Sequence, residues 1–192
     1  MSNLAEALNR IKNWQEQNGY QAASKLLPGL NHTEIQELSK DLPIELPTEV
    51  YELYQWRNGS SDDSWYFPLQ KAVAKYLRKV QYYDISWMTD LIRDPDGSNW
   101  FQIFVNGIED EHEGYIVICE NGKDYSILFL DFKGGDYLIT KKYTSLTSMM
   151  MTIAECRENG ISEQDREGYI IWHKYNKGVD PVKKVGLNLY GH

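Results

Sequence analysis

The sequence predicts an α+β fold in which helices come before and after a central, mainly antiparallel sheet of about four strands. Apolar residues recur at helical spacing as far as Val80, and four runs rich in β-branched and aromatic residues then follow between Trp100 and Tyr143. Helical spacing returns after Thr144. Helices that are separated in this way from consecutive strands are typical of α+β domains.

The N-terminal part of the chain is predicted to be helical. Ser2 can cap a first helix, and Asn18-Gly19 can end it. A short helical stretch is expected at residues 20–27. Thr33 and Gln36 have the T-x-x-Q spacing of a capping box, which predicts the start of a further short helix.

Two more helices are expected before the sheet. Pro47 suits the first position of one, and Asn58-Gly59 is a strong stop signal for it. The other covers residues 69–80. Much of its polar face is basic, with Lys71, Lys75, Arg78 and Lys79. At helical spacing these side chains indicate a solvated surface rather than a groove for nucleic acid.

The predicted sheet is a meander. Its strands are expected at residues 100–106, 114–120, 125–132 and 137–143. Asn121-Gly122 and Gly134-Gly135 lie in the short connections, and such dipeptides are typical of hairpin turns between antiparallel strands. C-terminal helices should then pack on the sheet, one ending at Asn159-Gly160 and another at residues 163–175.

Composition limits the classes of protein that remain. The chain has 192 residues, of which 28 are acidic and 20 basic, and its net charge is −8 at pH 7. This balance argues against nucleic acid and against an anionic membrane surface as partners. Residues 1–192 are expected to form a single domain, because no low-complexity linker divides them. No apolar signal segment or membrane-length run is visible, so we expect a cytoplasmic protein.

The sequence contains no recognisable catalytic motif. The four histidines lack the spacing of a zinc site, so we expect neither a metal nor a cofactor. Residues 94–99 resemble the start of a calcium loop without its final Glu, which favours a plain turn. Cys119 and Cys156 are expected to be small buried side chains. Glu120 and Asp131 lie on neighbouring predicted strands, and a small-substrate hydrolase with these paired carboxylates is the least favoured interpretation.

Two segments are candidate partner-binding sites. The acidic residues 109–113 could form a solvated hairpin loop, a contact surface or, least favoured, a cation site. Residues 65–67 are aromatic and follow two aspartates, so they could be interface anchors, although a short core strand is favoured. The partner-binding residues expected from both segments are Asp62, Asp63, Trp65, Tyr66, Asp110, Glu111 and Glu113.

Several segments resemble the SUKH superfamily, the type of the fungal cell-wall assembly regulator and its bacterial relatives. Residues 46–54, LPTEVYELY, followed by Asn58-Gly59, resemble its "LP…Y…L…NG" signature. Further along, the segments that resemble its glycine-and-aromatic strand, its "V-x-F-x-D" strand and its closing helix are EGYIV at residues 113–117, ILFLD at residues 127–131 and YTSL at residues 143–146. The resemblance covers about residues 28–158, with helical and C-terminal extensions on either side.

The resemblance implies a non-enzymatic protein-binding domain. Bacterial members are similar to immunity proteins, which neutralise polymorphic toxins by direct binding. Between Asn106 and Asp136 there are eight acidic residues and two lysines, a net charge of −6. The favoured hypothesis is therefore an immunity protein whose acidic surface meets a toxin domain with a basic face. The main alternative is a regulatory interaction protein of the fungal type.

Overall fold

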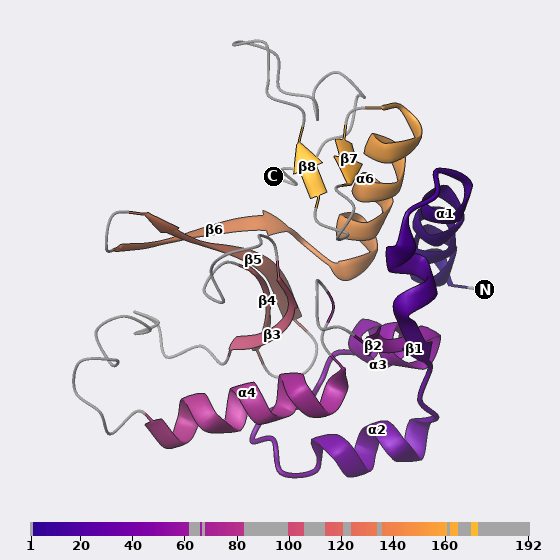
Figure 1. The fold of residues 1–192 in the computed structure, drawn as a ribbon. Coiled ribbons are helices and arrows are strands. Elements are labelled where there is room, and N and C mark those ends of the chain that lie inside the picture. The colour runs from indigo at the N-terminus through magenta and orange to yellow at the C-terminus, as the bar shows by residue number, and fades with distance from the viewer. Residues whose placement is uncertain are drawn as a thin grey trace.

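The computed structural model describes residues 2–61, 66, 68–82, 100–105, 114–120, 124–133, 136–160, 162–164 and 170–172. Helices lead the chain, a sheet follows, and a further helix comes after the sheet (Figure 1), so the α+β prediction is confirmed. The helical elements are α1 (Asn3–Gln17), the 3-10 helix η1 (Gln21–Lys25), α2 (His32–Ser39), α3 (Thr48–Trp56), α4 (Leu69–Tyr82) and α6 (Leu146–Glu158). The strands are β1 (Leu26–Pro28), β2 (Arg57–Ser60), β3 (Trp100–Val105), β4 (Gly114–Glu120), β5 (Asp124–Lys133), β6 (Asp136–Tyr143), β7 (Ser162–Gln164) and β8 (Ile170–Trp172).

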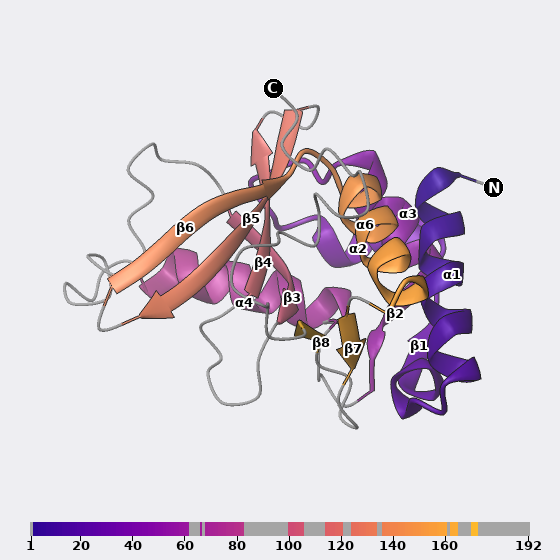
Figure 2. The same cartoon turned by 90° about the horizontal axis from the view of Figure 1, so that it is seen from above.

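The central sheet has the predicted meander topology. Its strand order is β3-β4-β5-β6, and each neighbouring pair is antiparallel. β4 and β5 pair without interruption from Gly114↔Leu130 to Glu120↔Asp124. The register shifts between Gln102 and Phe104, and irregularities of this kind increase the twist of a strand pair. Figure 2 shows the β5–β6 hairpin extending away from α1 and α6.

The first helix has its predicted caps, whereas the next segments differ from expectation. The Ser2 hydroxyl oxygen accepts a hydrogen bond from the Ala5 N–H at 3.3 Å. α1 ends before Asn18-Gly19, where Gly19 has a φ of 74°. The helical stretch expected at residues 20–27 is confirmed only as η1, because the chain extends after Lys25 into β1.

The predicted capping box has different residues in the structure. Asn31, not Thr33, is the N-cap of α2, and its side chain accepts a hydrogen bond from the Glu34 N–H at 2.9 Å. The Glu34 carboxylate in turn accepts from the Asn31 N–H at 2.7 Å. The prediction with Gln36 is therefore wrong. Asn at the cap and an anionic Glu in the first turn both suit the positive end of a helix.

The Asn58-Gly59 dipeptide has a role that periodicity alone does not reveal. α3 already ends at Trp56, and the dipeptide lies in β2, which pairs antiparallel with β1. The Asn58 side-chain oxygen accepts a hydrogen bond from the Leu69 N–H at 2.9 Å, so it satisfies a donor in the first turn of α4. Gly59 has a φ of 77°, a left-handed value that favours glycine.

The C-terminal part confirms one predicted helix and contradicts the other. α6 begins after Ser145, whose hydroxyl oxygen accepts from the Ser148 N–H at 3.0 Å, and it ends before Asn159-Gly160. The helix expected at residues 163–175 is wrong, because β7 and β8 pair antiparallel within that range. Ile170, Ile171 and Trp172 are β-branched or aromatic, so local preference for a strand prevails over the weak helical spacing.

One hydrophobic core joins the helices to the sheet. α1 packs against α6, α3 against α1, and α4 against β3. Figures 1 and 2 both show α1 beside α6. Leu8, Leu53, Phe101 and Leu146, from four different elements, are all at most 1% exposed. Among the described helices, none combines the length and the apolar character that crossing a bilayer requires.

Candidate protein-interaction surface

Six of the seven predicted partner-binding residues lie outside the described residues. They are Asp62, Asp63, Trp65, Asp110, Glu111 and Glu113. The whole acidic segment 109–113 and the turn at residues 94–99 lie outside them as well. The binding role of these six residues therefore stays a prediction.

Tyr66, the seventh, belongs to the core. Its exposed fraction is 0%, and its ring centroid lies 5.5 Å from that of Tyr54 and 5.3 Å from that of Phe104. Its hydroxyl donates to the Arg57 carbonyl at 2.7 Å, and burial raises the pKa of this hydroxyl well above its ordinary value. A ring that is enclosed between α3 and β3 does not reach a partner. Its placement corrects the anchor hypothesis for Tyr66 and agrees with the core-strand interpretation.

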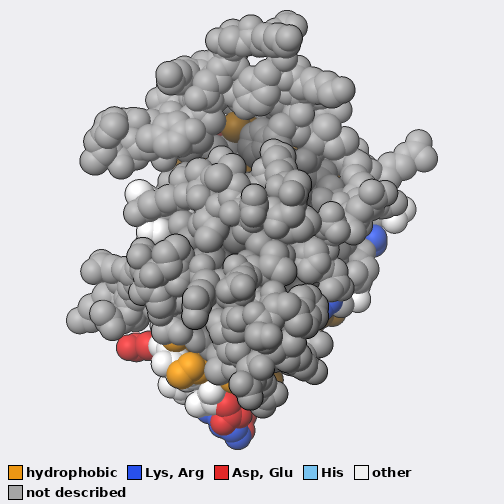
Figure 3. Space-filling view, turned by 90° about the vertical axis from the view of Figure 1, so that its left-hand side faces the viewer, with side chains coloured by type: hydrophobic (Ala, Val, Ile, Leu, Met, Phe, Trp, Pro, Cys, Tyr) orange, Lys and Arg blue, Asp and Glu red, His pale blue; other side chains and the backbone are white. Residues whose placement is uncertain are grey.

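Within the described residues there is a second acidic segment, separate from the acidic stretch between Asn106 and Asp136. In residues 31–52, six carboxylates accompany one lysine, a net charge of −5. Five of these carboxylates are exposed or partly exposed on α2, on α3 and between them, and we call this set the acidic edge: Glu34, Glu37, Asp41, Glu45 and Glu52. Figure 3 shows acidic side chains at the lower end of the molecule, at the level of α2 in Figure 1. A charge count over this segment is the sequence signal that would have found them.

The carboxylates of the acidic edge are not equivalent. Glu34 closes the capping box of α2, and Glu37 forms an ion pair with Lys40. Asp41, Glu45 and Glu52 make no hydrogen bond or ion pair with any other described residue. Exposed charges of this kind attract an opposite charge over about 10 Å at moderate salt. Within the acidic edge, these three carboxylates are therefore the ones free to meet a basic partner.

Close backbone contact holds the start of the acidic edge against α3. A Cβ atom on Gly29 would lie 1.9 Å from the Gln55 carbonyl oxygen, so only glycine fits there. The next N–H, that of Leu30, donates to the Tyr54 carbonyl at 2.9 Å. These contacts fix the segment that leads into α2, and they give the acidic edge a defined position on the core.

Glu49, the sixth carboxylate of this segment, is half-buried like Glu52, but its oxygens are occupied by hydrogen bonds. It accepts hydrogen bonds from the Thr147 N–H at 3.2 Å, from the Thr147 hydroxyl at 2.7 Å and from the Tyr125 hydroxyl. The Tyr125 oxygen accepts from the Leu146 N–H at 3.0 Å. Together with the Ser145 cap, this cluster satisfies the first donors of α6 and places an anion at the positive end of the helix. Glu49 thus joins α3, β5 and α6.

The register of the sheet separates the two carboxylates of the hydrolase interpretation. Glu120 pairs with Asp124 at one end of the β4–β5 pair, whereas Asp131 lies seven residues further along β5 and pairs with Leu138. At about 3.4 Å per residue this is roughly 24 Å, well beyond the separation that paired catalytic carboxylates require. The expectation that these two groups could come close is wrong.

Other reactive groups are not assembled in the described part of the chain. No group of three His, Cys, Asp or Glu side chains there could hold a metal ion. Cys156 is buried, as predicted, and burial raises the pKa of its thiol. A thiol whose pKa is raised is a poor nucleophile at neutral pH.

The fold, the LPTEVYELY segment on α3 and the meander together define a SUKH-like α+β domain. The model of the SMI1 / KNR4 family (SUKH-1) matches residues 29–146, which is more than half of the chain. The protein belongs to this family, and the resemblance seen in its motifs is confirmed. A comparison with curated proteins finds no match. The family is consistent with a role in protein interaction or immunity, and the matched region includes the acidic edge and the sheet but not α1.

Proposed function

We propose that this protein is a cytoplasmic immunity protein that neutralises a polymorphic toxin by binding it directly, without catalysis. Family membership supports a protein-interaction or immunity role. The observation that carries the proposal further is the acidic edge, in which Asp41, Glu45 and Glu52 have no described partner. A surface of this charge favours a partner with a basic face.

The chemistry of many toxin domains supplies such a face. Enzymes that act on nucleic acids or nucleotides hold phosphate in basic clefts. An acidic surface is steered to a basic cleft during association and can then occlude it. The acidic edge would provide part of this surface. Asp110, Glu111 and Glu113 would extend it, and Trp65 beside Asp62 and Asp63 would serve as its aromatic anchor.

The direct test is complex formation with the toxin domain that is encoded next to this gene. We expect the purified full-length proteins to form a stable complex, and co-expression should protect cells from the toxin. If the two proteins do not bind and deletion of this gene causes no loss of protection, the immunity proposal is refuted. Binding to a non-toxic protein instead would favour the regulatory alternative.

Charge reversal tests which surface is used. Glu45→Lys should slow association with the toxin several-fold at low salt, and a triple variant that also carries Asp41→Lys and Glu52→Lys should slow it by about tenfold or more. Glu6→Lys, an exposed position on α1, makes the same change in net charge and is the matched control. Equal association rates for Glu45→Lys and Glu6→Lys would show that net charge, not the acidic edge, steers the partner.

A further inference from the structure

Arg157 is a buried cation with unused hydrogen-bond donors. It lies in the last turn of α6 and is 3% exposed. Its Nε and Nη1 groups donate to no acceptor among the described residues. Burial lowers the pKa of Arg157 to about 10, so the guanidinium keeps its charge at neutral pH. Buried polar groups are paired in the great majority of cases, and buried charges more strictly so, which means that this guanidinium requires an acceptor.

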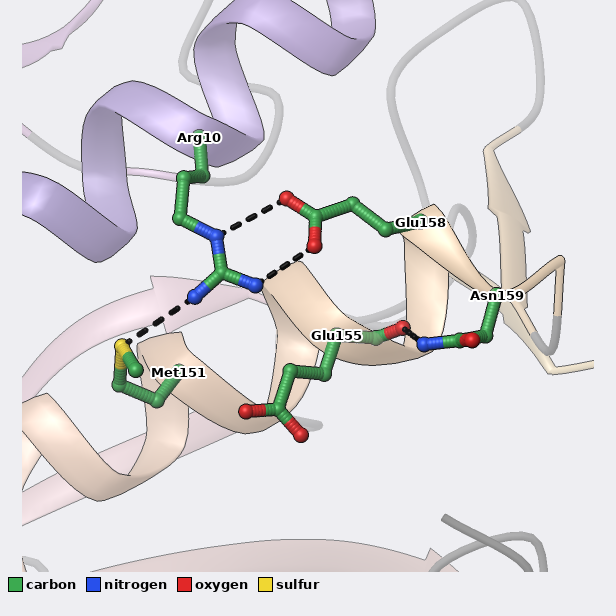
Figure 4. A network of polar contacts seen from close by, with 5 residues as sticks. All are labelled: Arg10, Met151, Glu155, Glu158 and Asn159. Carbon is green, nitrogen blue, oxygen red and sulfur yellow. Dashed lines mark hydrogen bonds and ion pairs between the residues drawn. The ribbon is translucent and has the colours of Figure 1, made fainter.

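The nearby carboxylates are paired with other residues or do not face Arg157. Glu158 accepts from the Nε and Nη2 groups of Arg10 at 2.9 and 2.6 Å (Figure 4). Glu155 is two residues from Arg157 on the same helix, and residues at that spacing do not face each other. Glu16 of α1 pairs with a lysine of its own helix at 2.6 Å. The described carboxylates of α1 and α6 therefore leave Arg157 without an anionic partner.

An aromatic ring lies over this guanidinium. Its central carbon lies 5.5 Å from the centroid of the Trp14 ring. Trp14 stacks on Tyr20, with ring centroids 5.2 Å apart and planes inclined by 17°. Both rings are half-buried, so the aromatic pair leads from the guanidinium towards the surface. A ring face attracts the cation, but it does not replace the acceptors that the guanidinium N–H groups require.

We propose that Arg157 and Trp14 form a binding site for a carboxylate at the junction of α1 and α6. A guanidinium presents two edges to a planar carboxylate, Nε with Nη2 and Nη1 with Nη2. Because Nε and Nη1 belong to different edges, each edge keeps a free donor. Arg10, which holds Glu158 through Nε and Nη2, shows the same chemistry on the same pair of helices.

The charge of the site favours a carboxylate over a phosphate. Arg10 and Lys12, the other described cations of this helix pair near the site, are already paired with Glu158 and Glu16. One unpaired positive charge matches one negative charge, whereas phosphate recruits several donors or cations. The inference does not depend on toxin binding, because the site lies outside the acidic edge.

The test is an NMR titration of the full-length protein with sodium acetate at constant ionic strength, with chloride as the replaced anion. We expect one arginine Nε–H resonance to shift with saturation. That resonance should be absent from Arg157→Lys and retained in Arg10→Lys. Arg157→Lys should weaken acetate binding at least tenfold, because lysine lacks the planar fork. If Arg157→Lys does not fold, Trp14→Leu identifies the resonance, since loss of the ring current shifts it.

Two probes distinguish whether the carboxylate comes from a small ligand or from a partner's side chain. A peptide with one internal Asp forms the second arm of the titration. Saturable binding of acetate alone assigns the site to a small ligand, and binding of both probes assigns it to a side chain of a partner. Shifts that grow linearly with acetate, or that all arginines share, would overturn the proposal.

Discussion

The α1–α6 pair and the acidic edge use charged residues in opposite ways. Across the helix pair, the guanidinium of Arg10 holds both oxygens of Glu158. On the acidic edge, by contrast, carboxylates such as Glu45 reach solvent without a described partner. Charges that pair across two elements are committed to the fold, whereas exposed charges without a partner add little to stability and remain available for association. The comparison separates charges that build this protein from charges that it can offer to a partner.

The largest effect should come from detaching the acidic edge from α3. Gly29→Ala places a Cβ atom 1.9 Å from the Gln55 carbonyl oxygen, and the atoms that it meets belong to the backbone and cannot rotate away. We expect the free energy of unfolding to fall by about 3 kcal/mol, measured by urea denaturation.

Gly19→Ala is the control for this substitution. Gly19 has a φ of 74°, and a Cβ atom added there would meet nothing within 4 Å. The cost of this change is therefore backbone strain alone, about 1–2 kcal/mol. If Gly29→Ala is the milder of the two, the contact with α3 is not what positions the acidic edge.

A smaller effect on the free energy of unfolding is expected for Glu49, whose carboxylate joins α3 to β5 and α6. Glu49→Gln removes the charge that accepts from Thr147 and Tyr125, and we expect a loss of about 2 kcal/mol in the free energy of unfolding. Glu52→Gln is the matched control on the same helix, and it should change stability by less than about 0.5 kcal/mol. Equal losses in the free energy of unfolding for the two variants would show that the hydrogen bonds of Glu49 do not set it apart from Glu52.

The ion pair between α1 and α6 should contribute less, and its effect should depend on pH. The hydrogen bond with Arg10 lowers the pKa of Glu158. A lowered pKa in the folded state stabilises the protein above the unfolded value of about 4.3, and this stabilisation is lost as the pH falls through the folded pKa. Because the Glu158 side chain is 40% exposed, Glu158→Gln should cost only about 0.5 kcal/mol at pH 7.

The difference between wild type and Glu158→Gln should therefore shrink in acid. Denaturation curves at pH 7 and pH 3 measure it directly. A difference that stays constant over this interval would mean that the charge of Glu158 does not contribute to the pair.

The smallest effect on stability is expected on the acidic edge itself. The double variant Asp41→Asn, Glu45→Gln should unfold within about 0.5 kcal/mol of wild type, because neither side chain has a described partner. Its association with a basic toxin domain should nevertheless be slower at low salt. A loss of stability above about 1 kcal/mol would place these carboxylates among the structural charges.

Local sequence signals predicted most of the fold. Ser2 caps α1, α6 follows Thr144 and ends before Asn159-Gly160, and the strand pairing of the meander follows from its short connections. Prediction was incomplete where distant partners decide. Asn58 has the local character of a helix end, yet it lies in β2 and accepts from Leu69, a partner eleven residues away. Tyr66 shows the same limit, because it has the character of an anchor but is enclosed by the core, whereas the other six predicted site residues lie outside the described residues and stay predictions.

By itself, the sequence determined the α+β class, the four-strand meander, the family and the acidic balance, because periodicity, turn residues and charge are local or additive properties. The tertiary structure decided which charges are committed. Glu49 and Glu52 lie three residues apart on one helix and are both half-buried, yet the first accepts from Thr147 of α6 and the second has no described partner. Arg157 is buried because α1 brings Trp14 against it. Such outcomes depend on which elements pack together, and no local pattern specifies that.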